Sequence, residues 1–388
     1  MKEQKKIGNT LLGALLLGAL LHLGCETKLP TWGAQAWGRD DGSLEVIPIG
    51  SALGEIVVDP QRPYLYLSDF DANRLYFISR DSRRIEKEMM IGTRPADLGF
   101  SMDGNQLYVA LAGGSQIAVL DLDLQTAVAP IQLNFSPAYL AAGRPPFMYA
   151  SSVLELWEGF QPQGQSFQVN FQAHTQVAVP QLRLLDIHPQ RSALYAANNR
   201  QIFHFSINQI DGTLTLKTVL NAEGHVVELF LSEDGTRLYT ISTGFLTLPE
   251  GIVTRGLIDS RKNFETDMVE VYATDPLLKI GELHTGAFPR AVAASGQYLV
   301  VAAADSSSTP KRAGFVVRYD LETLTPLETY RLAGSPTSCA AVDSATGMFY
   351  VAIDNPYDLR ERFGERQDLQ VVDLRGASTP AAVGEKRP

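Results

Sequence analysis

The chain has 388 residues, of which 45% are hydrophobic and 20% are charged, a composition typical of folded globular proteins. Two cysteines exclude a disulfide-rich scaffold and any zinc or iron–sulfur site built from several cysteines. The formal net charge of -10 argues against nucleic acid as a main partner, because phosphate binding favours a basic surface.

Residues 1–24 are expected to form a signal peptide. Lys2, Lys5 and Lys6 precede an apolar run from Leu11 to Leu23. The run is too short for a membrane-spanning helix of about 20 residues, and it fits the hydrophobic region of a secretory signal.

The residues around Cys25 resemble the processing site of bacterial lipoproteins, in which a small residue and then a cysteine follow the apolar run. The resemblance implies a lipid on Cys25 and cleavage before it. His22 departs from the pattern, since lipoproteins usually carry leucine there, so an ordinary secretory signal and an uncleaved anchor stay open. Glu26, in place of aspartate, implies the outer membrane of a bacterial cell envelope, facing either the periplasm or the surface.

Residues 25–43 are expected to be a tether, and residues 375–388 a flexible tail. The tether contains Trp32 and Trp37 beside Pro30 and two glycines. We expect both tryptophans to pack back onto the folded body, with contact to a partner as the alternative. The tail contains Gly, Ala and Pro residues and no apolar run, as is common at chain ends.

One repeat runs through the rest of the chain. A pair of large apolar residues recurs after a turn, and the steps between its second members are 42, 41, 46, 44, 60 and 51 residues. Further short apolar runs follow each pair, and no segment keeps a helical period. Four short strands repeated seven times are the signature of a β-propeller, so residues 44–374 are predicted to form an all-β, seven-bladed propeller. The pairs are Leu65-Tyr66, Leu107-Tyr108, Met148-Tyr149, Leu194-Tyr195, Leu238-Tyr239, Tyr298-Leu299 and Phe349-Tyr350.

The second repeat also resembles the YVTN-type repeat of seven-bladed propellers. It contains Gly92 and Pro95, then the turn Asp103-Gly104, then Leu-Tyr-Val at 107–109 and Val-Leu-Asp-Leu at 119–122. The resemblance covers nearly the whole body of the chain. It implies the fold and says almost nothing about activity.

The ring is predicted to close through an N-terminal strand. The last repeat ends after its third strand at Leu374, and Asp41-Gly42-Ser43-Leu44 resembles Asp211-Gly212-Thr213-Leu214, which precedes a fourth strand. Residues 44–49 are therefore expected to be the outer strand of the seventh blade. Pairing the two ends of the chain in one blade removes an open sheet edge.

Three consecutive blades have long connections between their second and third strands, at 243–267, 305–313 and 354–368. Connections longer than about 12–15 residues are usually functional or disordered. Aromatic and arginine side chains are enriched where proteins bind partners, and these segments contain both. A solvated insertion is the alternative. The candidate binding residues are Phe245, Leu248, Arg255, Arg261, Phe264, Lys311, Arg312, Tyr357, Arg360, Arg362, Phe363 and Arg366.

The axial mouth is the second candidate site. Alignment of the repeats places Arg94 and His225 at turns before inner strands, and Glu55, Asp97 and Glu228 three residues after such turns. Three carboxylates could hold a divalent cation, the only cofactor that the sequence suggests, or could line a solvated channel. His225 beside Arg94 and Glu228 could act as an acid or base on a small ligand, although an exposed or satisfied histidine is the simpler interpretation.

The sequence also leads to expectations for the burial of Cys339 and His188. Cys339 in the first strand of the seventh blade is expected to be a buried thiol that packs as a small hydrophobe. His188 occupies a hairpin position where other repeats have serine, and it is expected at the surface.

Two functional hypotheses follow. The first is a lipid-anchored envelope protein, monomeric, that binds a protein or glycan through its long loops. The second is an enzyme or a carrier of a small ligand or metal at the axial mouth, as similar propellers include lactonases, quinoprotein-type dehydrogenases and haem-handling proteins. Their catalytic motifs do not map onto residues here, so no catalytic residue is assigned and the second hypothesis rests on fold analogy.

Overall fold

The computed structural model describes residues 45–143, 146–154, 163–170, 175–179, 182, 184–188, 192–198, 200–222, 225–244, 264–285, 288–304, 314–354 and 366–375. All of them belong to the unit Gly38–Pro388, and every helix or strand assigned among them is a β-strand. None of these residues forms a helix that is long and apolar enough to cross a membrane. The expected signal peptide, Cys25 and the tether lie outside this range.

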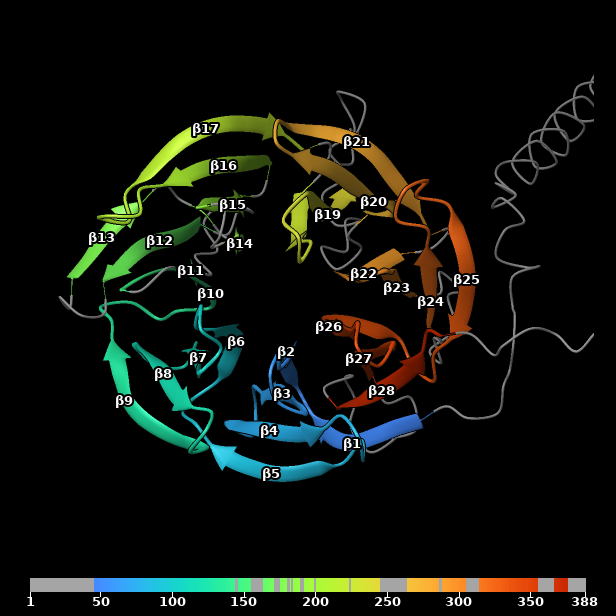
Figure 1. Ribbon diagram of the computed structural model, residues 1–388, viewed down its shortest axis with the longest axis horizontal. Coiled ribbons are helices and arrows are strands. Elements are labelled where there is room, and N and C mark those ends of the chain that lie inside the picture. Colours follow the sequence, from blue (N-terminus) through green and yellow to red (C-terminus); the bar gives the residue numbers. More distant parts are fainter. Residues whose placement is uncertain are drawn as a thin grey trace, which may run out of the picture. The chain divides into compact units, whose positions relative to one another are not determined.

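The strands form seven four-stranded antiparallel sheets, arranged as blades around an axis (Figure 1). In blades 1 to 6 the strands follow chain order from the axis outward. Blade 1 contains β2 (Leu53–Val58), β3 (Tyr64–Asp69), β4 (Arg74–Ser79) and β5 (Ile85–Met90). Blade 2 contains β6 (Pro95–Phe100), β7 (Gln106–Leu111), β8 (Gln116–Asp121) and β9 (Thr126–Gln132). Blade 3 contains β10 (Tyr139–Ala142), β11 (Phe147–Leu154), β12 (Gln163–Asn170) and β13 (Thr175–Val179).

The remaining blades complete the ring and confirm the predicted all-β, seven-bladed architecture. Blade 4 contains β14 (Leu184–His188), β15 (Ala193–Ala197), β16 (Gln201–Ile207) and β17 (Leu214–Asn221). Blade 5 contains β18 (His225–Leu231), β19 (Arg237–Gly244), β20 (Phe264–Thr274) and β21 (Leu277–His284). Blade 6 contains β22 (Phe288–Ser295), β23 (Tyr298–Ala304), β24 (Gly314–Tyr319) and β25 (Pro326–Arg331). Blade 7 contains β26 (Pro336–Asp343), β27 (Met348–Asp354), β28 (Gln367–Asp373) and β1 (Glu45–Ser51).

The core is divided into layers between neighbouring blades. One buried cluster, for example, joins Tyr66 and Phe77 of blade 1 to Leu98 and Val109 of blade 2. The tyrosine of the repeat lies on the second strand and is at most 4% exposed in each of six blades. Each repeat of about 42 residues therefore contributes one tyrosine to a buried layer between two blades. The six tyrosines are Tyr66, Tyr108, Tyr149, Tyr195, Tyr239 and Tyr350.

The Asp-Gly turns form the hairpins between first and second strands, as expected. Gly104 has a φ of 69°, a left-handed conformation that glycine adopts without steric cost. Asp103 accepts hydrogen bonds from the Ser101 hydroxyl at 2.6 Å and from the Asn105 backbone N–H at 3.1 Å. These local bonds hold the turn in its conformation.

The N-terminal strand β1 closes blade 7, which confirms the predicted closure (Figure 1). β1 runs antiparallel to β28, with Ile47 opposite Leu369 and Ser51 opposite Gln367. The carboxylate of Asp368 accepts the backbone N–H groups of Ile49 at 2.7 Å and Gly50 at 3.0 Å, where the pairing register shifts. Asp368 thus accepts hydrogen bonds from two backbone N–H groups that have no partner in the strand pairing.

A second bond across the closure lies at the other end of the strands. The guanidinium of Arg80 in blade 1 donates to both carboxylate oxygens of Asp343 in blade 7, at 2.7 and 2.6 Å. Asp343 is only 2% exposed. Bidentate pairing of this kind holds both groups in a fixed geometry, so an ion pair joins blades 7 and 1.

The two single-residue expectations have opposite outcomes. Cys339 is a free, buried thiol with 1% exposure, as predicted. The surface position predicted for His188 is wrong, because this side chain is only 7% exposed. A Cβ on Gly235 would lie 1.8 Å from the His188 ring, so the glycine turn of blade 5 covers the histidine of blade 4.

We predict that Asp368→Ala lowers the free energy of unfolding by about 2 kcal/mol, because two partly buried N–H groups lose their acceptor. Asp368→Asn keeps one oxygen acceptor and should cost about half as much. Urea unfolding of both variants measures the difference. Equal stability of Asp368→Ala and the unchanged protein would show that the strand ladder alone closes the ring.

Candidate functional site

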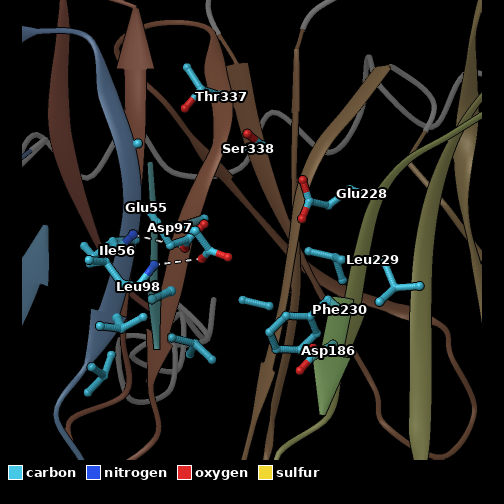
Figure 2. Close-up of a pocket in the computed structure, with 18 of the residues that line it drawn as sticks. Glu55, Ile56, Asp97, Leu98, Asp186, Glu228, Leu229, Phe230, Thr337 and Ser338 are labelled. Carbon is cyan, nitrogen blue, oxygen red and sulfur yellow. Dashed lines mark hydrogen bonds between the residues drawn. The ribbon is translucent and has the colours of Figure 1, made fainter. Parts of the chain in front are cut away.

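The seven inner strands, β2, β6, β10, β14, β18, β22 and β26, surround an axial channel of about 1500 Å³. Its wall combines aliphatic side chains with carboxylates from blades 1, 2, 4, 5 and 7. We call Glu55, Asp97, Asp186 and Glu228 the channel carboxylates. Figure 2 shows Asp97 and Glu228 on facing walls, with Asp186 below Glu228 in this view.

Irregular strand pairing places three of these side chains. The register of β2 shifts between Leu53 and Ile56, and that of β6 shifts between Pro95 and Leu98. Glu55 and Asp97 fall inside these shifts, and Glu228 borders the corresponding shift in β18. A bulge turns side chains away from the regular alternation, which is why bulges recur beside functional sites.

Asp97 connects two blades. One carboxylate oxygen accepts the N–H of its neighbour Leu98 at 2.8 Å, and the other accepts the N–H of Leu140 in blade 3 at 2.7 Å. The inner strand of a blade is an edge strand of its sheet. Its N–H groups that point away from the neighbouring strand therefore need acceptors from outside the sheet.

Asp186, which the sequence analysis missed, repeats this arrangement between blades 4 and 5. Its oxygens accept the N–H of Ile187 at 2.7 Å and the N–H of Leu231 at 2.8 Å. When the repeats are aligned by their Leu-Tyr pairs, Leu184 falls in the same row as Glu55, Asp97 and Glu228. Alternate residues of a strand lie on the same side, so Asp186, two residues after Leu184, also faces the channel. The alternation of side chains along the strand could have identified Asp186 from the sequence.

Burial sets the protonation of the carboxylates. Removal from water raises the pKa of Asp97 to about 7, against the opposing effect of its two backbone hydrogen bonds and with a contribution from the charge of Asp186. Burial likewise raises the pKa of Asp186 to about 6. The pKa of Glu55 is raised well above its ordinary value by burial first, and then by the charges of Asp97 and Glu228.

Arg94 is one of the residues that line this channel, and a binding role for it stays a prediction. Its guanidinium carbon is 5.5 Å from the centre of the Phe70 ring, a cation–π contact. Arg94 has a φ of 53°, and its N–H donates to the Asn73 side chain at 2.8 Å. His225 begins β18, but its side chain lies outside the described part, so acid–base work by His225 stays a prediction.

The described residues give no support for the expected cation site, because they contain no suitable set of coordinating side chains. Among the described residues, no three His, Cys, Asp or Glu side chains are arranged to hold a metal ion together. Both oxygens of Asp97 already accept backbone N–H groups. A divalent cation at Glu55, Asp97 and Glu228 therefore stays a prediction.

The long connections begin and end at paired strand positions on three consecutive blades. Gly244 is paired with Phe264, Ala304 with Gly314, and Asp354 with Gln367. Arg366 is exposed. Only the backbone of Phe264 is described, and the other candidate binding residues lie outside the described range: Phe245, Leu248, Arg255, Arg261, Lys311, Arg312, Tyr357, Arg360, Arg362 and Phe363.

The strand ends at which the blade 7 connection begins and ends lie beside the channel. Asp354 and Gln367, between which the blade 7 connection runs, line the channel together with Arg94 and Ser335. The pKa of Asp354 is raised by burial, which outweighs the lowering by a hydrogen bond from Gln367 and by the charge of Arg290. A partner on this face would meet the mouth as well as the loops.

Comparison with known proteins supports the fold alone. No family model matches the chain, and no curated protein matches it in sequence. Kuenenia stuttgartiensis hydrazine synthase is similar in structure, with 14% identity, a TM-score of 0.60, and coverage of 87% of this chain and 99% of that chain. The β-propeller domain of Myceliophteria thermophila Cps50 (Swd1) has 10% identity, a TM-score of 0.59, and coverage of 84% and 98%. U3-55K has 13% identity, a TM-score of 0.60, and coverage of 87% and 100%.

We predict that Gly54→Ala lowers the free energy of unfolding by about 2 kcal/mol. An added Cβ would lie 2.6 Å from the carbonyl oxygen of Ala96 in blade 2 and 2.6 Å from the Ser68 hydroxyl, so the inner strands would have to separate. Gly114→Ala is the matched control, because a Cβ there meets nothing within 4 Å, and it should change stability by less than about 0.5 kcal/mol. Chemical denaturation measures the stability of both variants. Equal effects would contradict the close contact of Gly54 with Ala96 and Ser68.

Proposed function

We propose that the chain is a lipid-anchored β-propeller of the bacterial cell envelope that binds a protein or glycan partner through one loop-bearing face. The observation that carries the proposal is the position of the long connections. Segments 245–263, 305–313 and 355–365 start and finish at the same ends of adjacent blades. A rigid ring that carries long loops side by side is a common way to build a recognition surface.

The chemistry of these segments favours a macromolecular partner. They contain Phe245, Tyr357 and Phe363 together with several arginines, and Phe264 follows the first segment directly. Aromatic and arginine side chains dominate the energy of protein interfaces, and aromatic rings also stack on sugar faces. The mixed charges of the blade 7 segment supply polar contacts for the rim of such an interface.

The entry point of the chain is compatible with an N-terminal anchor. β1 begins at Glu45, which is paired with Val371 near the end of β28, whereas the long connection joins β28 at its other end, beside Gln367. The chain therefore enters the ring at the face opposite the long connections. A lipid on Cys25 would not need to occupy the partner face.

We predict that Cys25→Ser moves the protein from the membrane fraction to the soluble fraction, because the lipid is the proposed attachment. Fractionation, labelling with radioactive palmitate, and the mass of the N-terminal peptide measure this change. A protein that stays in the membrane fraction without a lipid on Cys25 would contradict the anchor and would favour an uncleaved N-terminal segment.

We predict that replacing residues 245–263 by Asn-Gly abolishes partner capture while the ring stays folded. Gly244 and Phe264 are paired, so a two-residue turn joins them in register. Crosslinking in the native membrane followed by mass spectrometry measures the partner and the sites of its crosslinks. A scrambled segment of the same length and composition tests whether its sequence, rather than its bulk, is recognised.

A second control lies on the opposite face. Ile210 is 89% exposed in the turn between the third and fourth strands of blade 4, and Ile210→Ser should leave capture unchanged. If the Asn-Gly variant retains its partner, or if Ile210→Ser loses it, the loop-bearing face is not the binding surface. The axial channel would then become the leading candidate, as the site of a small ligand or cation.

A further inference from the structure

The arginines that line the channel differ in how their charge is used. Among the described residues these are Arg80, Arg94 and Arg290. Arg80 donates to both oxygens of Asp343, and Arg290 lies close enough to Asp354 for its charge to act on that carboxylate. The side chain of Arg94 is exposed, and the described part of the chain supplies no carboxylate or carbonyl acceptor for its guanidinium. Arg94 therefore keeps its charge and its donors for a ligand.

We propose that Arg94, stacked on Phe70, binds a carboxylate side chain of a protein partner at the loop-bearing face. The site rests on the proposed function, because its ligand is taken to belong to the partner that the long connections bind. Geometry around Arg94, its backbone conformation and the charge of the channel wall all favour this use.

Arg94 lies on the same side of the ring as the long connections. It ends the connection from β5 to β6. The strands of each blade are antiparallel, so connections from a fourth strand to the next first strand run on the same side as those from second to third strands. A partner held by the long connections thus lies over the side of the ring that presents Arg94.

The backbone at Arg94 is held from both neighbouring blades. The side chain of Asn73 in blade 1 accepts the Arg94 N–H at 2.8 Å. From blade 2, the Ala112 N–H donates to the Arg94 carbonyl oxygen at 2.8 Å, and the Gly113 N–H donates to the Thr93 carbonyl oxygen at 3.1 Å. A Cβ on Gly113 would lie 2.5 Å from the Thr93 side chain, so the two connections are in close contact. A fixed backbone lowers the entropy that binding must cost.

Phe70 orients the guanidinium. The guanidinium carbon of Arg94 lies 5.5 Å from the centre of the Phe70 ring. Phe70 is itself fixed, because its N–H donates to the Ala52 carbonyl oxygen at 2.8 Å and the buried Asp69 before it accepts the Ala72 N–H at 2.7 Å. A guanidinium stacked on a ring keeps its N–H groups free at the edge, where a planar carboxylate can accept two of them. Arginine is among the residue types enriched at the energetic centres of protein interfaces.

The backbone of Arg94 is strained. Its φ is 53°, and the next residue is Pro95. A left-handed conformation is costly for a residue with a Cβ, and a following proline restricts it further. Glycine would adopt this conformation without steric cost. Strained residues cluster at functional sites, and here the strained position carries the arginine whose donors are unused.

The channel wall determines how far an anionic group can enter. Asp97 comes three residues after Arg94, and Glu55 and Glu228 lie on other inner strands of the same wall (Figure 2). A carboxylate that moved inward would meet these acidic side chains in place of the arginine. It is therefore held at the rim, with the rest of its molecule outside the ring. A side chain of a large partner fits this position better than a small ligand enclosed in the channel.

A random peptide library displayed on phage tests the site without the natural partner. The library is selected on the full chain in detergent and then depleted on Arg94→Gln. We expect the remaining peptides to contain an aspartate or glutamate, and replacement of that residue by its amide to weaken binding at least about tenfold. A selection that returns no Arg94-dependent peptide, or only such peptides without an acidic residue, would overturn the proposal. Arg94-dependent binding of a uronic-acid oligosaccharide alone would also overturn it, since the carboxylate would then come from a glycan.

Substitutions at the pair separate binding from folding. Arg94→Gly removes the side chain and relieves the left-handed backbone, so we expect peptide binding to be lost with no loss of stability in urea. Arg94→Lys keeps the charge without the planar fork and should weaken binding about tenfold, and Phe70→Leu should weaken it about threefold. Peptide binding that survives in Arg94→Gly would overturn the proposal.

Arg84→Gln is the matched control. Arg84 is exposed in the turn between β4 and β5, on the side of the ring opposite the long connections. Its replacement removes the same charge from the chain and should change peptide binding by less than about twofold. A loss equal to that of Arg94→Gln would show that net charge, and not the site, controls binding, and would overturn the proposal.

Crosslinking in the native membrane separates the carboxylate site from the proposed function. Both are supported if the Asn-Gly variant loses the partner and Arg94→Gln weakens its capture. If the Asn-Gly variant retains its partner while acidic peptides still bind through Arg94, the site stands and the loop-based function fails. If capture needs residues 245–263 but is unchanged in Arg94→Gln, the loop-based function stands and the carboxylate site is overturned.

Discussion

The pairing of β1 with β28 is the constraint on which the rest of the ring depends. Each of the other six blades is built from one continuous stretch of chain, but blade 7 is complete only when the first strand joins the last three. Asp368 accepts two N–H groups at this seam, and Arg80 joins Asp343 across the next interface. Because the blades pack only on their neighbours, opening this seam would expose two inter-blade layers at once.

A closed ring leaves backbone N–H groups without strand partners at its centre. Seven inner strands turn their free edges towards one channel, and their N–H groups require acceptors that no neighbouring strand supplies. Asp97 and Asp186 meet this need between blades 2 and 3 and between blades 4 and 5. The same carboxylates are partly desolvated, so the groups that satisfy the backbone also oppose one another in charge.

The sequence predicts the parts of the fold that follow from local pattern. The repeated Leu-Tyr pairs predict the seven blades, and the turn before residue 44 predicts the closing strand, because both depend on short segments. Asp186 was missed because the repeat alignment follows one row of the channel wall, while strand alternation creates a second row two residues away. His188 was misplaced because its cover, Gly235, comes from another blade and leaves no local signal.

The two candidate sites differ in what the ring contributes to each. Among the channel carboxylates, Asp97 and Asp186 are held by backbone N–H groups from two blades each, so the spacing of those blades fixes their positions. The long connections leave from paired strand ends, so the ring fixes where they begin and leaves their sequence free to vary. Asp354 and Gln367 line the channel and also bound the blade 7 connection, so the two candidate sites meet at these strand ends.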